Sequence, residues 1–505
     1  MCVRRHLYLA IIVLSCVFAS ARSTSGHSAS RTTAASPSVL TVTTHASAAK
    51  ELFEKGMADF IKEKPEAALQ SWRTAAAKDP RCGFIQAFIS FTTNDPAEES
   101  RARANAKRAA GCVSPGERLL VKWVVNVHED NYVTGIAAMN DLVAMYPKDK
   151  RLLSIAAHWL LSQKSYDPAR SLLQRALALD PKYPSALSDL GKIYAATGDF
   201  QHAFAAMERC VALLPDEPTP QQSYAEILRK GGNFQGALEH YRAALKLDPS
   251  FRAAQLGIAD TYALMGEEET ARKEYAVAMH TATNDSERIG YEIQSAITYV
   301  RESKYGKANA AFSGVAEHAR DAHLGRLDAE AYRIAATYQP DNEEALRFAA
   351  RAESALQESE GISQADAGEE RAQILEIRAI RNAALGRVQS SHEALEQLSH
   401  LADNSRGVTI EHAYHAAAGS VSLLEHKEAE AIPHLEEDDG NPYSMQQLVL
   451  AYNKTGAADK AHALELRIAA INEPTVEQAL VVPGLRAKLS ATKKRRTWLS
   501  KIVQH

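Results

Sequence analysis

Proline recurs every 34 residues through the middle of this 505-residue chain, at Pro147, Pro181, Pro215 and Pro249. Small residues keep the same interval, at Ala169, Ala203, Ala237 and Ala271 and at Gly191, Ala225 and Ala259. A fixed period of this length predicts an array of repeated units, each packed on the next. It replaces the three separate domains that a chain of this length otherwise suggests, at about 150 residues for each domain.

Each repeat is predicted to be a hairpin of two antiparallel helices. In residues 184–217, the small residues Gly191 and Ala203 allow close approach of the two helices, and Met207 fills the space beside them. Gly198 opens the turn between the helices, and a proline ends the second helix because it cannot extend the helical hydrogen-bond ladder. One hairpin cannot bury its own apolar face, so the hairpins must stack, which predicts an all-α fold.

Two consecutive repeats carry a family resemblance. The stretches PSALSDLGKIYAATGDFQHAFAAMERCVALLPDE (184–217) and PTPQQSYAEILRKGGNFQGALEHYRAALKLDPSF (218–251) resemble tetratricopeptide (TPR) repeats. The resemblance is strong over 150–284 and moderate over 49–473, which corresponds to about twelve hairpins. It implies a TPR superhelical solenoid of antiparallel helix pairs.

The sequence predicts five segments with different roles. These are a signal peptide (1–21), a Ser/Thr-rich disordered tether (22–48), a well-matched TPR array (49–318), degenerate TPR-like helical repeats (319–484) and a basic amphipathic tail (485–505).

The first 21 residues have the layout of a secretory signal peptide. Arg4 and Arg5 precede an apolar run at 7–18, and Ala19-Ser20-Ala21 is a small-x-small cleavage pattern. The run is shorter than the ~20 residues that span a bilayer. We therefore expect an exported protein, periplasmic or secreted. The alternatives are an uncleaved anchor and a lipoprotein lipidated at Cys16, although Leu14 fits the lipidation pattern poorly.

Charge is distributed unevenly along the chain. The whole chain has 58 Lys and Arg against 62 Asp and Glu, a net charge of −4, so no global basic field attracts nucleic acid. Residues 22–47 are rich in Ser and Thr and contain no acid. We found no apolar period in them, and we therefore interpret them as a flexible tether.

Three cysteines remain after the predicted cleavage, and oxidising conditions outside the cell allow them to pair. Cys82 opens one predicted helix pair and Cys112 closes it, so these two are candidate partners for a disulfide. Two buried thiols are the alternative. Cys210 stands where other repeats have alanine, which predicts a small core residue.

The sequence lacks the motifs of the common catalytic centres. It contains no HExxH, no cysteine pair at metal-binding spacing and no Gly-x-Ser-x-Gly elbow. His412 and His415 share a helix face and could bind a metal with a third ligand, but scattered histidines on a solvated helix are commoner. We therefore expect no catalysis, no cofactor and no bound metal.

The TPR resemblance implies a concave groove lined by the first helix of each hairpin. Mapped onto this sequence, its lining includes His158, Lys192, Glu226, Arg229 and Asp260. Side chains of both signs favour a polar, extended peptide as the ligand. The Lys and Asn clamp by which one TPR subgroup holds a terminal carboxylate is not matched here.

The C-terminal tail is basic. Lys493, Lys494, Arg495 and Arg496 precede Trp498 and further apolar residues on one helical face. Such a segment can lie on an anionic membrane surface. A solubilising cap for the last repeat is the alternative.

Together these features predict a non-catalytic, exported TPR scaffold that binds a protein or peptide partner in its groove. The alternative is an outer-membrane or envelope assembly lipoprotein, or an accessory subunit of an envelope enzyme complex. The oligomeric state and the partner's identity do not follow from the sequence.

Overall fold

The computed structural model describes residues 39–503, except 63, 94, 110–112, 130, 360, 361, 363 and 406. The side chains of 96, 97, 365 and 492–503 are also outside the description. The predicted signal peptide, Cys16, and residues 22–38 of the predicted tether therefore lie outside the described residues, as does Cys112.

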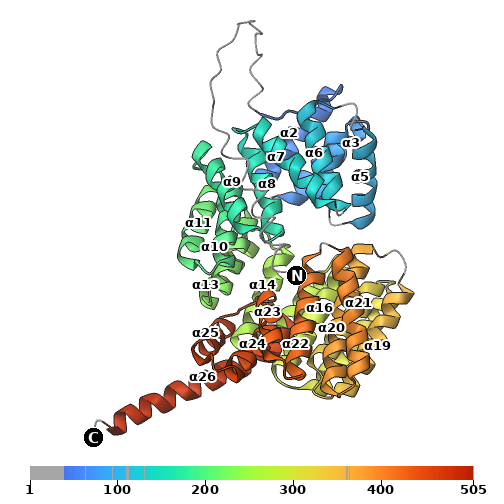
Figure 1. The fold of residues 1–505 in the computed structure, drawn as a ribbon. Helices are drawn as coiled ribbons and strands as arrows, with labels where there is room; N and C mark the ends of the chain where they lie inside the picture. Colours follow the sequence, from blue (N-terminus) through green and yellow to red (C-terminus); the bar gives the residue numbers. More distant parts are fainter. Residues whose placement is uncertain are drawn as a thin grey trace, which may run out of the picture. The chain divides into compact units, whose positions relative to one another are not determined.

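The described part of the chain contains 25 helices and no strand (Figure 1). Twelve consecutive pairs and one final helix account for them, which confirms the predicted all-α array of about twelve hairpins. The first six pairs are α2 (Ser47–Ile61) with α3 (Pro65–Lys78), α4 (Gly83–Thr92) with α5 (Pro96–Ala109), α6 (Pro115–His128) with α7 (Tyr132–Met145), α8 (Lys150–Ser162) with α9 (Tyr166–Leu179), α10 (Pro184–Ala196) with α11 (Phe200–Leu213), and α12 (Pro218–Lys230) with α13 (Phe234–Leu247).

The remaining pairs are α14 (Arg252–Met265) with α15 (Glu268–Thr281), α16 (Asp285–Arg301) with α17 (Tyr305–Asp321), α18 (Gly325–Tyr338) with α19 (Asn342–Glu358), α20 (Gln364–Ala384) with α21 (Val388–Asn404), α22 (Val408–Leu424) with α23 (Glu428–Glu437), and α24 (Pro442–Lys454) with α25 (Ala458–Ala469). The last helix is α26 (Val476–Val503). We call the even-numbered helix of each pair its first helix.

The small residues of the repeat allow the close approach that the sequence predicted. A Cβ atom built on Gly191 would lie 2.9 Å from Sδ of Met207, and one on Gly257 would lie 2.2 Å from the ring of Tyr241. Ala203 and Ala237 are fully buried. Any larger side chain at these positions would push the two helices of a hairpin apart.

Several of the hairpin turns adopt a left-handed backbone conformation. Gly198 and Gly232 supply it with φ near +80°, as expected from the sequence. The weaker repeats use other residues at the corresponding turns, among them Ser303, with φ +55° between α16 and α17. A residue with a Cβ atom is strained in this conformation.

Replacing Ser303 with glycine is therefore expected to stabilise the hairpin of α16 and α17 by about 0.5–1 kcal/mol, because the strain is relieved. Urea unfolding followed by circular dichroism measures the change. Gly198→Ser is the matched reverse substitution, and it should destabilise by a similar amount. A stabilising effect of Gly198→Ser would contradict this interpretation.

Residues 39–46, at the end of the predicted tether, are packed against the first hairpins. Leu40 and Val42 are 4% and 5% exposed and belong to the same apolar cluster as the helices of the first five pairs. This differs from the flexible segment that we expected up to residue 48, because two apolar side chains bury themselves just before α2.

The basic tail also differs from the prediction, because it is part of a longer helix. Helix α26 begins at Val476, and its first turns are buried against helices far apart in the sequence: α16 and α18 on one side, α24 and α25 on the other. The loop that precedes α26 contacts α12. The Asn472 side chain donates to the carbonyl of Lys230 at 3.1 Å, and Glu473 pairs with the Lys230 ammonium at 2.9 Å.

None of the described helices combines the length and apolar character needed to cross a membrane.

Candidate functional site

The first helices of consecutive hairpins present polar side chains to one another. We call the side chains that α8, α10, α12 and α14 contribute there the first-helix face. Three contacts join residues 31 positions apart: Ser154 with Ser185, His158 with Asp189, and Arg229 with Asp260. This spacing is three residues shorter than the 34-residue repeat. Each side chain therefore contacts a residue that lies about one helical turn before its own equivalent in the next repeat.

Asp189 is the centre of the first group. Its carboxylate is buried, with Oδ2 3.0 Å from Nδ1 of His158 and Oδ1 3.2 Å from Nζ of Lys192. Burial alone would raise the pKa of Asp189, but His158 and Lys192 together hold it at about 2. The carboxylate therefore stays ionised and positions the His158 imidazole and the Lys192 ammonium, both partly exposed, on this face.

Arg229, Asp260 and Tyr275 form a second, buried group. The Arg229 guanidinium donates to Oδ2 of Asp260 at 2.8 Å, and the Tyr275 hydroxyl donates to Oδ1 at 2.7 Å. Arg229 and Asp260 are 5% and 6% exposed. Burial would lower the pKa of Arg229, but Tyr241 and Asp260 raise it, so the guanidinium remains charged.

This arrangement corrects the prediction for two residues. Arg229 and Asp260 were expected to meet a partner, but they bind each other inside the array. His158, Lys192 and Glu226 remain at least partly exposed. This face therefore carries an imidazole and an ammonium beside a buried carboxylate, and a separate carboxylate, Glu226, on the next first helix.

A cavity of about 770 Å³ borders His158. It lies where α2, α4, α6 and α8 end and the turns to α3 and α7 begin. Its lining combines aromatic side chains with charged and imidazole groups, among them Phe60, Arg73, Phe91, Tyr132, Trp159 and His128. An aromatic cavity rimmed by polar groups is typical of a site that receives a side chain of a bound segment.

A smaller cavity of about 90 Å³ lies beside the start of α26. Glu376 and Glu477 line it, together with Arg333, whose guanidinium pairs with Glu370 at 2.5 Å. Burial raises the pKa of Glu376 well above the usual range, and Asp438 and Glu477 raise it further. The raised pKa of Glu376 thus arises mainly from burial, and the neighbouring acids add to it.

Asp438 belongs to the same crowded region. Burial raises its pKa to about 7, and Glu477 adds to this rise, while Ser444, Lys164 and Asn441 oppose it. The folded protein therefore holds a proton on Asp438 that the unfolded chain releases near pH 4. As pH rises from 5 to 8 this residue should remove about 3 kcal/mol of folding stability, from two pH units at ~1.4 kcal/mol each.

Asp438→Asn should abolish that part of the pH dependence, because the amide does not ionise. Chemical unfolding of wild type and variant at pH 5 and pH 8 gives the comparison. The variant is expected to gain about 3 kcal/mol relative to wild type between the two pH values. A difference between the two proteins that does not change with pH would refute the assignment.

The histidines considered as metal ligands have other neighbours. Nδ1 of His412 lies 3.3 Å from Oδ1 of Asp438, and Nδ1 of His415 lies 3.0 Å from Nδ1 of His434. Within the described ranges, no group of three His, Cys, Asp or Glu side chains could hold a metal ion.

The cysteine predictions have separate outcomes. The thiol of Cys82 is buried and donates to the carbonyl of Thr43 at 3.5 Å, and burial raises its pKa to about 11. Its pairing with Cys112 stays a prediction, because Cys112 lies outside the described residues. Cys210 is fully buried, as predicted for a small core residue.

The side chains of Lys493, Lys494, Arg495, Arg496 and Trp498 also lie outside the description, so membrane contact stays a prediction.

Sequence reasoning missed Asp189 and Tyr275. The sequence does contain a signal for the buried carboxylates. In two places a basic residue type is followed 31 residues later by an aspartate: His158 by Asp189, and Arg229 by Asp260. A search at that offset within the 34-residue repeat would have found both buried carboxylates.

The repeat register and the paired helices agree with a comparison to family models. A model described as "Tetratricopeptide repeat" matches residues 160–227 and 228–290. These residues are similar to tetratricopeptide repeats. The match spans the TPR helices α10 to α15 and most of the α8–α9 hairpin. The other hairpins repeat its helix pairing without matching the model.

Solved structures with similar folds include several TPR proteins. A tetratricopeptide repeat protein from Parabacteroides merdae is 13% identical, with a TM-score of 0.35, covering 54% of this chain and 93% of its own. YrrB, described as "a TPR protein with an unusual peptide-binding site", is 17% identical, with a TM-score of 0.28, covering 42% and 96%. The Cut9–Hcn1 assembly of APC/C is 16% identical, with a TM-score of 0.38, covering 80% and 76%.

The likeness to tetratricopeptide repeats therefore rests on the sequence match over residues 160–290 and on the helix pairs. No curated protein matches the sequence.

Proposed function

We propose that this chain is a non-catalytic, exported scaffold whose TPR array binds a protein or peptide partner on the first-helix face. The observation that carries the proposal is the group around Asp189. A buried, ionised carboxylate fixes the His158 imidazole and the Lys192 ammonium side by side on consecutive repeats. A rigid pair of this kind is suited to acceptors on a bound segment, such as backbone carbonyls or a carboxylate.

Glu226 extends this face by one repeat with the opposite charge. A partner segment that presents an acceptor to His158 and Lys192 and a cation to Glu226 would match both charges. The aromatic cavity beside His158 would take an apolar side chain from the same segment. The partner that this chemistry favours is an extended peptide with a carboxylate, an apolar anchor and a basic residue.

Photo-crosslinking tests the proposal. A photoreactive amino acid replaces Glu226 in the mature chain, and the protein is irradiated in an envelope extract of its source organism. The matched control places it at Glu239, an exposed residue on the second helix α13 of the same hairpin. We expect a discrete crosslinked product only from position 226, reduced at least fivefold by H158A/K192A. Identical products from both positions would reject the face as the binding site.

Export is proposed on the signal-peptide pattern of residues 1–21. Mass spectrometry of the purified native protein measures its first residue. A start at Arg22 would agree with a cleaved, soluble exported chain. A lipidated start at Cys16 would favour the alternative of an envelope assembly lipoprotein, and an intact Met1 would reject cleavage.

A further inference from the structure

Residues 39–44 form a short extended segment directly before the first described helix, α2. Leu40 and Val42 are buried, whereas Val39, Thr41 and Thr43 are exposed. Alternate burial of this kind is the pattern of an extended strand, in which successive side chains point to opposite sides. One side of the segment therefore packs against the helices and the other faces solvent, as in a bound extended peptide.

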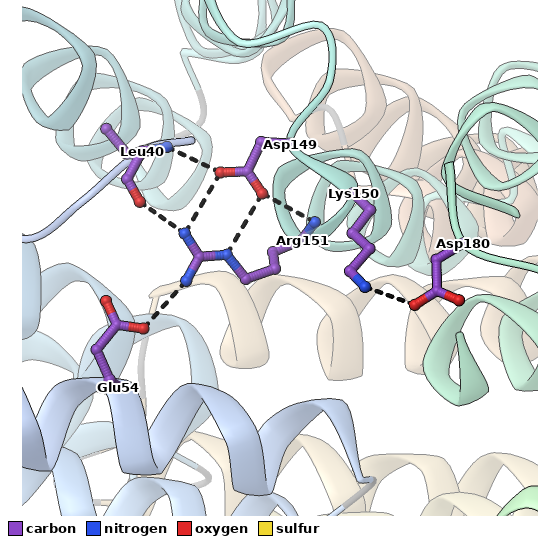
Figure 2. Close-up of polar contacts among 6 residues, drawn as sticks. All are labelled: Leu40, Glu54, Asp149, Lys150, Arg151 and Asp180. Atoms are coloured by element: carbon purple, nitrogen blue, oxygen red, sulfur yellow. Dashed lines mark hydrogen bonds and ion pairs between the residues drawn. The ribbon is translucent and has the colours of Figure 1, made fainter. Parts of the chain in front are cut away.

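The main chain of Leu40 is held by the loop that opens α8. Its N–H donates to Oδ2 of Asp149 at 2.9 Å, and its carbonyl accepts from Nη2 of Arg151 at 2.7 Å (Figure 2). Arg151 also pairs with Asp149 and with Glu54 of α2, as the dashed lines in Figure 2 show. The two charged groups thus bind the donor and the acceptor of one peptide residue, whatever its side chain is.

Two further carboxylates continue this contact towards the first hairpin. Oε1 of Glu117 accepts the N–H of Thr43 at 2.6 Å, and Oδ2 of Asp79 accepts the Thr44 hydroxyl at 2.6 Å. Asp79 is the C-cap of α3, Glu117 lies in the first turn of α6, and Asp149 is the N-cap of α8. The ends of three helices therefore each supply one carboxylate oxygen to the segment.

The other oxygen of each carboxylate accepts a hydrogen bond from a backbone N–H of the array. Oε2 of Glu117 accepts the N–H of Ser114 in the capping box of α6, and Oδ1 of Asp149 accepts the N–H of Arg151 as the N-cap of α8. Oδ1 of Asp79 accepts the N–H of Arg81. These bonds within the array position the three carboxylates, so the acceptors are suited to an extended backbone.

The side chain of Leu40 enters an apolar slot between helices. The remaining cavity around it is only about 10 Å³, and its lining includes Phe53, Met57, Phe84, Phe88, Leu152 and Ile155. These residues come from α2, α4 and α8, so one leucine touches three hairpins. The slot favours this register, because a shift of one residue would replace Leu40 with Thr41 or with the shorter Val39 and would expose Leu40 to solvent.

We propose that α2, α4, α6 and α8 form an extended-peptide site, separate from the first-helix face, and that its occupant is this chain's own segment 39–44, bound in cis. The chemistry of the site defines what it accepts: an extended, acid-free segment with two apolar side chains in alternation, followed by a hydroxyl. An acidic residue in the segment would meet Asp79, Glu117 and Asp149 and be repelled.

The test adds the segment back in trans. The probe is a fluorescent peptide with the sequence of residues 36–46, SPSVLTVTTHA. The proteins are the full chain and its L40D/V42D variant, whose own segment can no longer occupy the site. Fluorescence anisotropy should show at least tenfold tighter binding of the peptide to the variant than to wild type, because wild type is already occupied.

Two matched peptides check the register. A peptide with V39A/T41A, altered on the exposed side, should bind the variant within threefold of the parent peptide. A peptide with L40D/V42D should bind at least tenfold more weakly. Equal weakening by both changes, or equal binding of the parent peptide to wild type and variant, would overturn the proposal.

Two other results would also overturn it. If L40D/V42D fails to fold, as judged by circular dichroism, the segment is part of the core rather than a ligand. If wild type forms a concentration-dependent dimer that the variant does not form, the segment is exchanged between copies rather than bound in cis. Hydrogen exchange on wild type gives an independent readout, since the bonded amides of Leu40 and Thr43 should exchange more slowly than that of Thr41.

Discussion

Replacing Asp260 with leucine while Arg229 stays in place is expected to destabilise the array by about 3–5 kcal/mol. The physical reason is the burial of both groups: Arg229 is 5% exposed, and its main compensation is the carboxylate 2.8 Å away. Removal of that carboxylate leaves a guanidinium in a poorly solvated site and also removes the acceptor of the Tyr275 hydroxyl. Urea unfolding followed by circular dichroism measures the loss.

The matched control removes both charges together. R229M/D260L is expected to lie within about 1–2 kcal/mol of wild type, because a buried ion pair replaced by apolar groups of similar size is often close to neutral. The double variant should also keep the Glu226 crosslink, since neither charge faces a partner. A double variant as unstable as D260L alone would show that the cost arises from packing rather than from an unpaired charge.

Replacing Trp72 with alanine is expected to lower the free energy of unfolding by about 3–5 kcal/mol. The indole is fully buried in the first hairpin and lies so close to Gly56 that a Cβ there would be 2.4 Å from its Nε1. Its N–H donates to the carbonyl of Phe53, and its ring centroid lies 5.1 Å from that of Phe88. Alanine therefore leaves a large cavity between α2, α3 and α4.

The location of the damage distinguishes this change from general unfolding. Repeat arrays open locally because each hairpin contacts mainly its neighbours. Hydrogen exchange should show lost protection in α2 to α5 and near-wild-type protection in α10 to α15. Leu179→Ala, at a side chain that is 45% exposed, is the control and should change stability by less than about 0.5 kcal/mol. Uniform loss of protection along the chain would contradict the local picture.

The hairpins were predictable because their signals are local and repeated. The 34-residue period, the small residues such as Gly191 and Ala203, and the turn at Gly198 each act within one hairpin or on the next one. The later hairpins use the same packing, with Ala345, Ala431 and Ala461 buried in their second helices. The left-handed turns at Ser303 and His323 could not be seen, because neither residue type marks that conformation in a sequence.

Which of the predicted groove residues bind a partner stays a prediction, because a residue's place on a helix does not say which neighbour it meets. Arg229 and Asp260 occupy groove positions of the family pattern, yet they are close enough to bind each other. Segment 39–44 was missed for a different reason. Two apolar side chains in a Ser/Thr-rich stretch are too short a pattern to distinguish from a linker, and the carboxylates that hold them lie up to 109 residues away.

Helix α26 changes how the C-terminal part of the array should respond to force. A tandem array pulled at its end peels one hairpin at a time, because only the last unit carries the load. Here the buried turns of α26 touch α16 and α18 as well as α24 and α25, so a pull on the C-terminus is shared between the end of the array and its middle. We therefore expect the hairpins between α16 and α25 to stay folded under tension until α26 separates from them.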